Sequence, residues 1–434
     1  MKLIDMAALY EKGAAVLYLA AKPVLEMWSR LEGPDGMWAG RLGDISGQIA
    51  DVGPYDIWMQ AVSVGEVAVA EAIVKAVDMK APGFNILISA TTPAGFARAM
   101  SSLAPRCSVI PYPIDFPQVV RKAVRAIRPR VYACIETELW PNFVRAVHAL
   151  GSASMLINGR ISERSFARYA KIKSVTRPLL DKFSMICAIS EVHAVRLNAL
   201  GAPMERIAIT GNAKFEGLIA RPDQERLDML RSRMGIDASM DVLVAGSIRK
   251  GEEKTVVGAY SSLLHSFPEL MLFLAPRHLK RVPSIISCLK RADISFQLWS
   301  ALEMGERRTS SVVVVDVVGP LFDIYGLASV SFVGGSLVPK GGQNIMEPAA
   351  WACPVLYGPH VDNFEEAKSA LDASGGGLEV RNAIELARAV DSLLKTPALR
   401  NKKGLDARAA LMELSQGAAS RQADMLIELL RSVA

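Results

Sequence analysis

The sequence predicts an α/β protein with two Rossmann-like, doubly wound domains that face a central cleft. Three observations support this prediction. Short apolar runs alternate with amphipathic helical patterns from residue 56 onward, the alternation stops over the polar residues 217–240, and it then restarts. Such alternation is typical of parallel sheets covered by helices. With 434 residues, of which 51% are hydrophobic, the chain is long enough for two domains of ordinary size.

We therefore divide the chain into an N-terminal segment at 1–50, a first domain at 51–220 and a second domain at 221–434. Seven apolar runs predict strands in the first domain, at 56–62, 84–89, 107–110, 131–135, 154–157, 185–189 and 206–209. Six predict strands in the second, at 241–246, 270–275, 295–298, 312–315, 330–333 and 355–357. The last helical pattern, 405–433, is long enough to reach back to the first domain.

The N-terminal segment contains an apolar run at residues 13–21, with charged residues such as Glu11 and Lys22 on either side. A membrane-spanning helix needs about 20 apolar residues, and this run is shorter. The segment also lacks the basic start and cleavage site of a secretory signal. We expect an amphipathic helix that associates with a membrane surface. A helix that caps the first domain is the alternative.

The charge distribution and the cysteine and histidine residues argue against a nucleic-acid-binding protein and against a zinc protein. The net charge is only +6, but residues 116–171 carry ten Lys and Arg against three acids. This excess suits an anionic surface or substrate, although solvated helix faces also explain it. No aromatic residues are interleaved as in single-stranded nucleic acid binders, so no nucleic acid partner is expected. Five scattered cysteines and five unclustered histidines predict reduced thiols and no zinc site.

Acidic residues follow two predicted strands. Glu66 comes directly after the first strand and opens a helix, where it could act as a general base or could simply favour the helix dipole. Glu136 and Glu138 follow the strand at 131–135, and burial of carboxylates is costly unless they are paired. We therefore expect Glu136 and Glu138 to contact a cation, a hydroxyl group or each other.

Basic and glycine-rich turns follow other predicted strands. Arg160, Lys214, Arg249 and Arg277 each lie in such a turn, and their convergence on one cleft indicates a phosphate-bearing donor. A glycine loop at 334–342 precedes a short predicted helix at 344–351. Its backbone N–H groups suit a phosphate or carboxylate, and Glu347 would lie near ribose hydroxyls. The Gly-x-Ser-x-Gly, Gly-x-Gly-x-x-Gly and P-loop motifs are absent.

Together these motifs resemble the transferases of 3-deoxy-D-manno-octulosonic acid (Kdo), a family of GT-B glycosyltransferases that acts in lipopolysaccharide synthesis. The resemblance rests on residues 61–67, 112–117, 135–142, 158–165, 210–216, 245–247, 276–278 and 332–349. It implies transfer of Kdo from CMP-Kdo to a lipid A precursor (lipid IVA), with inversion, at the cytoplasmic face of the inner membrane. It implies no cofactor and no metal.

The resemblance also implies roles for particular residues. Glu66 matches the catalytic base of the family, and Glu136 and Lys214 match residues that support the transition state. The residues that match CMP-contacting segments are Pro276, Arg277, Gly319, Pro320, Leu321, Asn344, Ile345, Met346 and Glu347. Two positions depart from the family pattern: Pro320 replaces a Glu, and Gln343 replaces a His.

Two alternatives stay open on the sequence alone. One is another two-Rossmann nucleotide-sugar enzyme, either a glycosyltransferase with a different donor or an epimerase. The other is a membrane-associated protein that binds a sugar nucleotide without catalysis. A carboxylate at Glu66 favours an enzyme, because a binding protein has no need of a base at that position.

Overall fold

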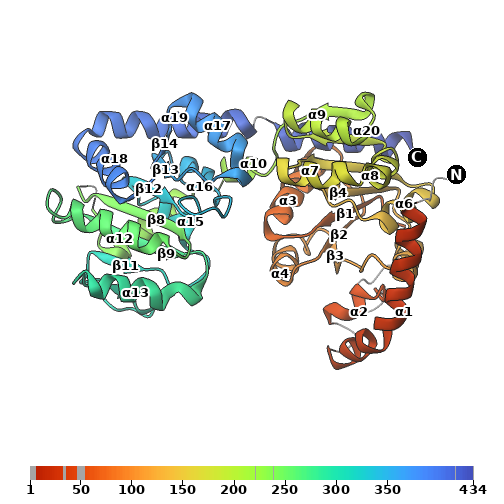
Figure 1. Ribbon diagram of the computed structural model, residues 1–434, viewed down its shortest axis with the longest axis horizontal. Coiled ribbons are helices and arrows are strands. Elements are labelled where there is room, and N and C mark those ends of the chain that lie inside the picture. The colour runs from red at the N-terminus through yellow and green to blue at the C-terminus, as the bar shows by residue number, and fades with distance from the viewer. Residues whose placement is uncertain are drawn as a thin grey trace. The chain divides into compact units, whose positions relative to one another are not determined.

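The computed structural model describes residues 6–32, 36–45, 54–219, 221–237, 239–415 and 417–433. The chain forms two compact units (Figure 1). Unit 1 contains Met1–Gly217 together with Ser415–Ala434, and unit 2 contains Leu218–Leu414. The last helix, α20 (Ala418–Ser432), therefore belongs to unit 1 although it follows unit 2 in sequence.

Unit 1 is built on a parallel sheet of seven strands in the order β3-β2-β1-β4-β5-β6-β7. The strands are β1 (Ile57–Ala61), β2 (Ile86–Ala90), β3 (Ser108–Pro111), β4 (Val131–Ile135), β5 (Ala153–Gly159), β6 (Met185–Ala188) and β7 (Ile207–Ile209). All seven predicted strands of this half are confirmed. The chain runs outward from β1 to β3 and then returns to β4 on the other side of β1, so the strand order reverses between β1 and β4. Ligands of open α/β sheets bind at such a reversal.

Helices cover both faces of this sheet (Figure 1). They are α3 (Val64–Lys80), α4 (Pro93–Ser102), α5 (Pro117–Ile127), α6 (Pro141–Ala149), α7 (Glu163–Lys171), α8 (Lys173–Leu180), α9 (Glu191–Leu200) and α20, with the short η1 (Met204–Arg206). The short α10 (Glu216–Ile219) contains the boundary between the two units in the sequence. Side chains alternate along β1, so Ile57 and Met59 pack with α3 and α20 while Trp58 packs on the other face. Each face of the sheet thus has its own apolar core.

The N-terminal helix α1 (Met6–Glu32) and the short α2 (Met37–Arg41) belong to unit 1. The Tyr10 hydroxyl donates a hydrogen bond to Asp115 at 3.1 Å, and the Tyr18 ring lies 5.3 Å from that of Phe116. Among the described helices, none combines the length and apolar character needed to cross a bilayer. The association of α1 with a membrane stays a prediction.

Unit 2 repeats the parallel architecture with the strand order β10-β11-β9-β8-β12-β13-β14. Its strands are β8 (Val242–Ile248), β9 (Met271–Pro276), β10 (Gln297–Leu298), β11 (Val312–Val314), β12 (Val330–Val333), β13 (Val355–Tyr357) and β14 (Gly377–Glu379). The six predicted strands are confirmed, and β14 is an addition that the sequence analysis missed. It begins at Gly377, the last of three consecutive glycines, and these glycines hide the apolar pattern of a strand.

The helices of unit 2 are α11 (Gln224–Met234), α12 (Glu252–Leu263), η2 (Leu279–Arg281), α13 (Val282–Arg291), α14 (Trp299–Glu303), α15 (Leu321–Tyr325), α16 (Met346–Ala350), η3 (Asp362–Phe364), α17 (Glu365–Ser374), α18 (Ala383–Lys395) and α19 (Pro397–Ser415). The polar stretch at 217–240 is not a plain linker, because it contains α11. The Asp223 side chain caps the start of this helix by accepting a hydrogen bond from the backbone N–H of Arg226. The apolar side chains of Leu227 and Met234 on this helix are buried.

Candidate active site

Glu66 lies where the strand order of unit 1 reverses. It follows β1 in the first turn of α3, and only 6% of the residue is exposed. Its carboxyl group accepts hydrogen bonds from the backbone N–H of Val62 at 2.7 Å and from the Ser63 hydroxyl at 3.1 Å. Burial, reinforced by the nearby charge of Glu136, raises the pKa of Glu66 from 4.5 to about 8. A carboxyl group with a pKa near the working pH suits proton transfer.

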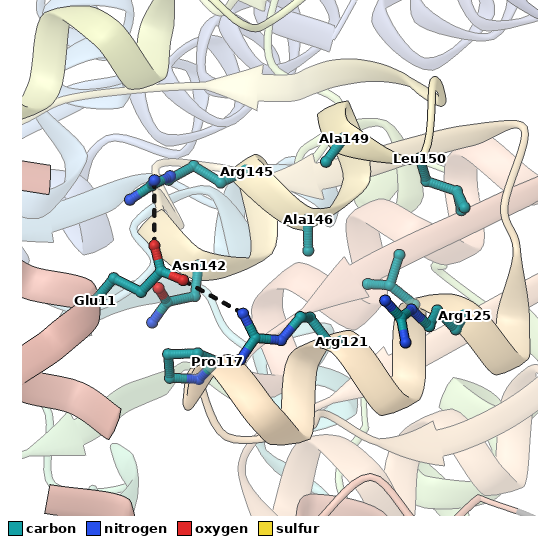
Figure 2. Close-up of a pocket in the computed structure, with 10 residues that line it drawn as sticks. Glu11, Pro117, Arg121, Arg125, Asn142, Arg145, Ala146, Ala149 and Leu150 are labelled. Atoms are coloured by element: carbon teal, nitrogen blue, oxygen red, sulfur yellow. Dashed lines mark hydrogen bonds and ion pairs between the residues drawn. The ribbon is translucent and has the colours of Figure 1, made fainter. Parts of the chain in front are cut away.

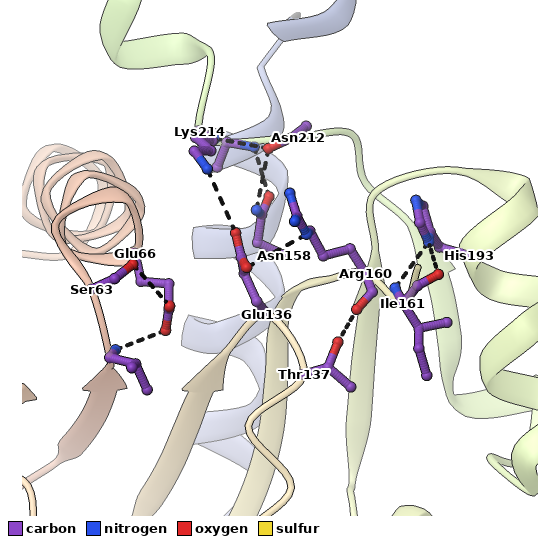
Figure 3. Close-up of polar contacts among 12 residues, drawn as sticks. Ser63, Glu66, Glu136, Thr137, Asn158, Arg160, Ile161, His193, Asn212 and Lys214 are labelled. Atoms are coloured by element: carbon purple, nitrogen blue, oxygen red, sulfur yellow. Dashed lines mark hydrogen bonds and ion pairs between the residues drawn. The ribbon is translucent and has the colours of Figure 1, made fainter. Parts of the chain in front are cut away.

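Glu136 follows β4, the strand beside β1, and faces two cations (Figure 3). Its carboxylate lies 3.5 Å from Arg160 Nε and 4.0 Å from Lys214 Nζ. The backbone of Glu136 has a φ of +61°, a left-handed conformation that residues other than glycine rarely adopt. Such strain is common at functional sites, where the surrounding structure holds it in place.

Of the acidic pair that the sequence singled out, only Glu136 contacts cations. The Glu138 carboxylate instead accepts a hydrogen bond from the indole N–H of Trp140 at 2.8 Å. Burial raises the pKa of Glu138 above its ordinary value. The two acids after β4 therefore have different surroundings, and Glu138 raises the pKa of Glu66 less than Glu136 does.

Lys214 is held by a network of buried amides. Asn158, fully buried at the end of β5, donates to Asn212 Oδ1 at 3.2 Å and accepts from the backbone N–H of Ala213 at 2.9 Å. Asn212 Oδ1 also accepts from the backbone N–H of Lys214 at 3.1 Å. These contacts fix the turn after β7, from which the Lys214 side chain reaches Glu136.

Helix α20 completes this network. The side chain of Gln422, which is fully buried, accepts from the backbone N–H of Asn158 at 3.0 Å and donates to the carbonyl of Gly211 at 3.2 Å. The sequence analysis missed this residue. Gln422 lies 264 positions after Asn158, and the sequence around it contains no recognisable motif. Its contact with Asn158 becomes visible only because the structure places α20 in unit 1.

Glycine at position 65 leaves room for Lys214. A β-carbon built at Gly65 would lie 3.3 Å from both Cε and Nζ of Lys214. A side chain at position 65 would therefore displace the end of the Lys214 side chain by a few tenths of an ångström. Glu66, Glu136 and Lys214, the three residues that the sequence analysis assigned to catalysis, thus share one edge of one sheet.

His193 lies near this group, and the sequence analysis gave it no role. Its Nδ1 accepts from the backbone N–H of Ile161 at 2.9 Å. Burial and the neighbouring positive charges of Arg196 and Arg160 lower the pKa of His193 to about 4. The imidazole is therefore neutral at physiological pH and supports the Arg160 turn.

In unit 2, the candidate donor-binding residues lie at the carboxyl edge of the sheet. Pro276 ends β9, and the backbone N–H of Arg277 donates to the carbonyl of Ile248. Gly319 has a φ of +124°, Pro320 caps α15, and Leu321 begins that helix. Asn344 accepts from the backbone N–H of Met346 at 3.2 Å, just before α16. Ile345 and Met346 are fully buried, so their side chains pack in the interior.

The glycine loop after β12 differs from the predicted anion cradle. The carboxylate of Glu252, fully buried at the start of α12, accepts from the backbone N–H groups of Gly335, Ser336 and Leu337 at 2.7–3.0 Å. It also accepts from the N–H of Arg249 at 2.8 Å. A carboxylate of the chain therefore occupies the donors that the sequence analysis assigned to a ligand. Gln343, one of the two departures from the family pattern, donates to the carbonyl of Gly342.

Among the residues that the structure describes, no group of three or more His, Cys, Asp or Glu side chains is arranged to bind a metal ion. The described cysteines are unpaired thiols, all of them buried.

Two parallel seven-stranded sheets, one in each unit, place the protein in the GT-B fold class. Solved structures with this fold include a glycosyltransferase from Rickettsia africae ESF-5, with a TM-score of 0.59, 15% identity and coverage of 87% of this chain and 99% of that chain. Another is the UDP-GlcNAc 2-epimerase from Neisseria meningitidis, with a TM-score of 0.60, 11% identity and coverage of 87% and 99%. At such identities the likeness concerns the fold alone.

Comparison of the sequence with known proteins identifies the family. Residues 36–217 match the family model described as 3-deoxy-D-manno-octulosonic-acid transferase. The 3-deoxy-D-manno-octulosonic acid transferase of Haemophilus influenzae is 32% identical over 374 residues, which cover 86% of this chain and 87% of that protein. The chain belongs to the Kdo transferase family, as the motifs predicted, and is a glycosyltransferase.

Proposed function

We propose that this protein transfers Kdo from CMP-Kdo to a hydroxyl group of a phosphorylated lipid A precursor, with inversion at the anomeric carbon. The observation that carries the proposal is the buried Glu66 carboxyl at the strand reversal of unit 1, close enough to Glu136 for their charges to interact. Membership of the Kdo transferase family supports the nature of the transferred sugar.

In the proposed reaction, the acceptor oxygen attacks the anomeric carbon of Kdo as the bond from that carbon to the phosphate oxygen breaks. CMP leaves with the bonding electron pair, and Glu66 takes the proton of the acceptor hydroxyl. A single displacement of this kind inverts the anomeric configuration. The ionised form of Glu66 is the active base, so the raised pKa makes the reaction sensitive to pH near neutrality.

Lys214 and Arg160 supply positive charge beside Glu136. We assign Lys214 to the negative charge of the Kdo carboxylate, with Glu136 fixing the position of the ammonium group. In unit 2, we assign the segments at Pro276–Arg277, 319–321 and 344–347 to the CMP moiety, with Arg277 on the phosphate. No step of this proposal uses a metal ion or a cofactor.

The acceptor is a lipid, and we propose that the protein acts at the cytoplasmic face of the inner membrane. Exposed apolar side chains of α1 support this proposal. They include Val16, Leu17, Val24, Met27, Trp28 and Leu31. Their helical spacing places them on one side of α1, with Glu11 and Tyr18 on the other.

The decisive experiment is product analysis with CMP-Kdo and lipid IVA in detergent. We expect CMP and a Kdo-bearing lipid, with an anomeric configuration opposite to that of the donor when examined by NMR. Retention of configuration would exclude the single displacement. Absence of any transfer, with CMP still bound, would identify a non-catalytic sugar-nucleotide binding protein.

A further inference from the structure

A second charged site lies in unit 1, between α1, α5 and α6. It is a cavity of about 280 Å³, close to the lower limit of roughly 300 Å³ for small-molecule sites. Three arginines, Arg121, Arg125 and Arg145, line it together with one acid, Glu11 (Figure 2). Among the described lining residues, three guanidinium groups thus face a single carboxylate.

Glu11 is shared between two of these arginines. One carboxylate oxygen lies 3.4 Å from a terminal nitrogen of Arg121, and the other lies 3.1 Å from Arg145 (Figure 2). By contrast, Arg98 binds Glu71 through two nitrogens at 2.9 and 2.6 Å. Single contacts between partly exposed side chains contribute little to stability. Glu11 is therefore a weakly bound counter-ion that a stronger anion can replace.

The geometry of two guanidinium groups around one anion suits a phosphate monoester. Its three terminal oxygens can accept from both arginines at once, and its higher negative charge attracts guanidinium groups more strongly than one carboxylate does. The rest of the lining is mostly apolar, from Val124, Ala146, Ala149 and Leu150. This apolar wall suits the non-ionic part of a larger molecule rather than a hydrated inorganic ion.

The position of the cavity identifies the source of the phosphate. Glu11 reaches the cavity from α1, the helix whose other side exposes Val16, Leu17 and Trp28. If this apolar side enters the membrane interface, lipid phosphates lie at the level of the flank of α1. We propose that the cavity between α1, α5 and α6 binds the phosphate monoester of a membrane lipid, which displaces Glu11 from Arg121 and Arg145. This inference rests on the membrane association proposed above but not on the transfer reaction.

Vesicle flotation of the full chain tests the site. Phosphatidylcholine vesicles would carry phosphatidic acid, a phosphate monoester, or phosphatidylglycerol, a diester, at matched surface potential. We expect the wild type to bind the phosphatidic acid vesicles at least fivefold more tightly. The double variant Arg121→Gln/Arg145→Gln should lose this preference, whereas Glu11→Gln should increase it, because the internal competitor is gone.

The matched control is Arg164→Gln/Arg168→Gln, which removes the same charge from the exposed side of α7 in unit 1. It should weaken binding to both vesicles equally and keep the preference. If the Arg121/Arg145 variant does not fold, Arg125→Gln replaces it, since Arg125 lies exposed on the same cavity wall.

Several results would overturn the proposal. If both double variants lost the preference for phosphatidic acid vesicles equally, the binding would be due to general charge attraction and not to this cavity. Weaker binding by Glu11→Gln would mean that Glu11 only fastens α1 to α5 and α6. Saturation by millimolar inorganic phosphate, measured as an increase in Tm without vesicles and without any monoester preference, would assign the cavity to a soluble anion. Failure to bind any vesicle would refute the membrane association and this site together, while leaving the transfer reaction in detergent untouched.

Discussion

Gln422, near the end of the chain, accepts a hydrogen bond from the backbone N–H of Asn158 at the end of β5. Asn158 in turn holds the turn of Lys214 through Asn212 and Ala213. The helix that returns from unit 2 thereby buttresses the edge of the sheet that carries the candidate base. The geometry of that edge depends on two segments more than 200 residues apart.

The first prediction concerns Glu66. Glu66→Gln should keep the fold, because an amide resembles the protonated carboxyl that burial favours. The transfer rate should fall by roughly 10²–10⁴, the usual contribution of general base catalysis. Single-turnover assays with CMP-Kdo measure it. Glu163→Gln, at an exposed first-turn acid of α7, is the control. A rate within threefold of the wild type would remove Glu66 from the mechanism.

The second prediction is the pH dependence of that rate. Since the ionised carboxyl is the base, the rate should rise with pH and reach half its maximum near the Glu66 pKa of about 8. Glu136→Gln removes a negative neighbour that raises this pKa, so the midpoint should move to lower pH. Glu138→Gln should move it less, because Glu138 is the weaker influence. Identical midpoints in all three proteins would contradict the electrostatic coupling.

The third prediction concerns stability. Burial raises the pKa of folded Glu66 above its ordinary 4.5, so folding favours the protonated form. Its stabilising contribution is complete below about pH 4.5 and is lost as the pH rises through about 8. The free energy of unfolding of the wild type, relative to Glu66→Gln, should therefore decline across this window. Denaturant titrations at several pH values measure it, and a flat difference would show that Glu66 is not buried as described.

The fourth prediction concerns Gln422. Gln422→Leu fills the same space but leaves the Asn158 N–H and the Gly211 carbonyl without this partner, at a cost of about 1–3 kcal/mol for each buried group. We expect a lower kcat and a higher KM for the donor, because Lys214, which we assign to the Kdo carboxylate, loses its support. Asp424→Asn on the same helix breaks only the surface pair with Lys80 and should leave kcat unchanged. Equal effects of both substitutions would mean that α20 has no specific role at the site.

The fifth prediction concerns Glu252. Its buried carboxylate accepts from four backbone N–H groups, so Glu252→Gln replaces one acceptor oxygen with an N–H donor that faces other donors. The free energy of unfolding should fall by at least about 3 kcal/mol. Chemical denaturation with Glu269→Gln, an exposed acid of unit 2, provides the comparison. A loss below 1 kcal/mol would indicate that the glycine loop is not held by this carboxylate.

The sequence predicted the strands well because both sheets are buried on two faces, which makes each strand a continuous apolar run. The position of Glu66 and Glu136 at the same edge of the sheet could also be predicted, since each follows a strand, and the two strands prove to be neighbours. Gln422 could not, because a long-range contact leaves no local pattern.

The glycine loop shows a different limit of sequence reasoning. Glycines after a strand indicate that backbone N–H groups approach an anion closely, and this part of the prediction is correct. The anion is Glu252, which lies 83 residues before Gly335 and begins another helix. Only the pairing of β8 with β12 brings it there, so the sequence could not distinguish a ligand from a carboxylate of the chain itself.

The return of the chain to unit 1 also has a consequence for biosynthesis. Unit 2 is contiguous, Leu218–Leu414, whereas unit 1 needs residues from Ser415 on to cover Ile73 and Val77 of α3 with Ala423, Leu426 and Leu430. During translation, unit 1, which carries Glu66, therefore cannot complete its apolar core until α20 has emerged from the ribosome. Ribosome-nascent chains stalled before residue 415 should present the uncovered apolar side of α3 to chaperones, and the half made second should be the first to mature.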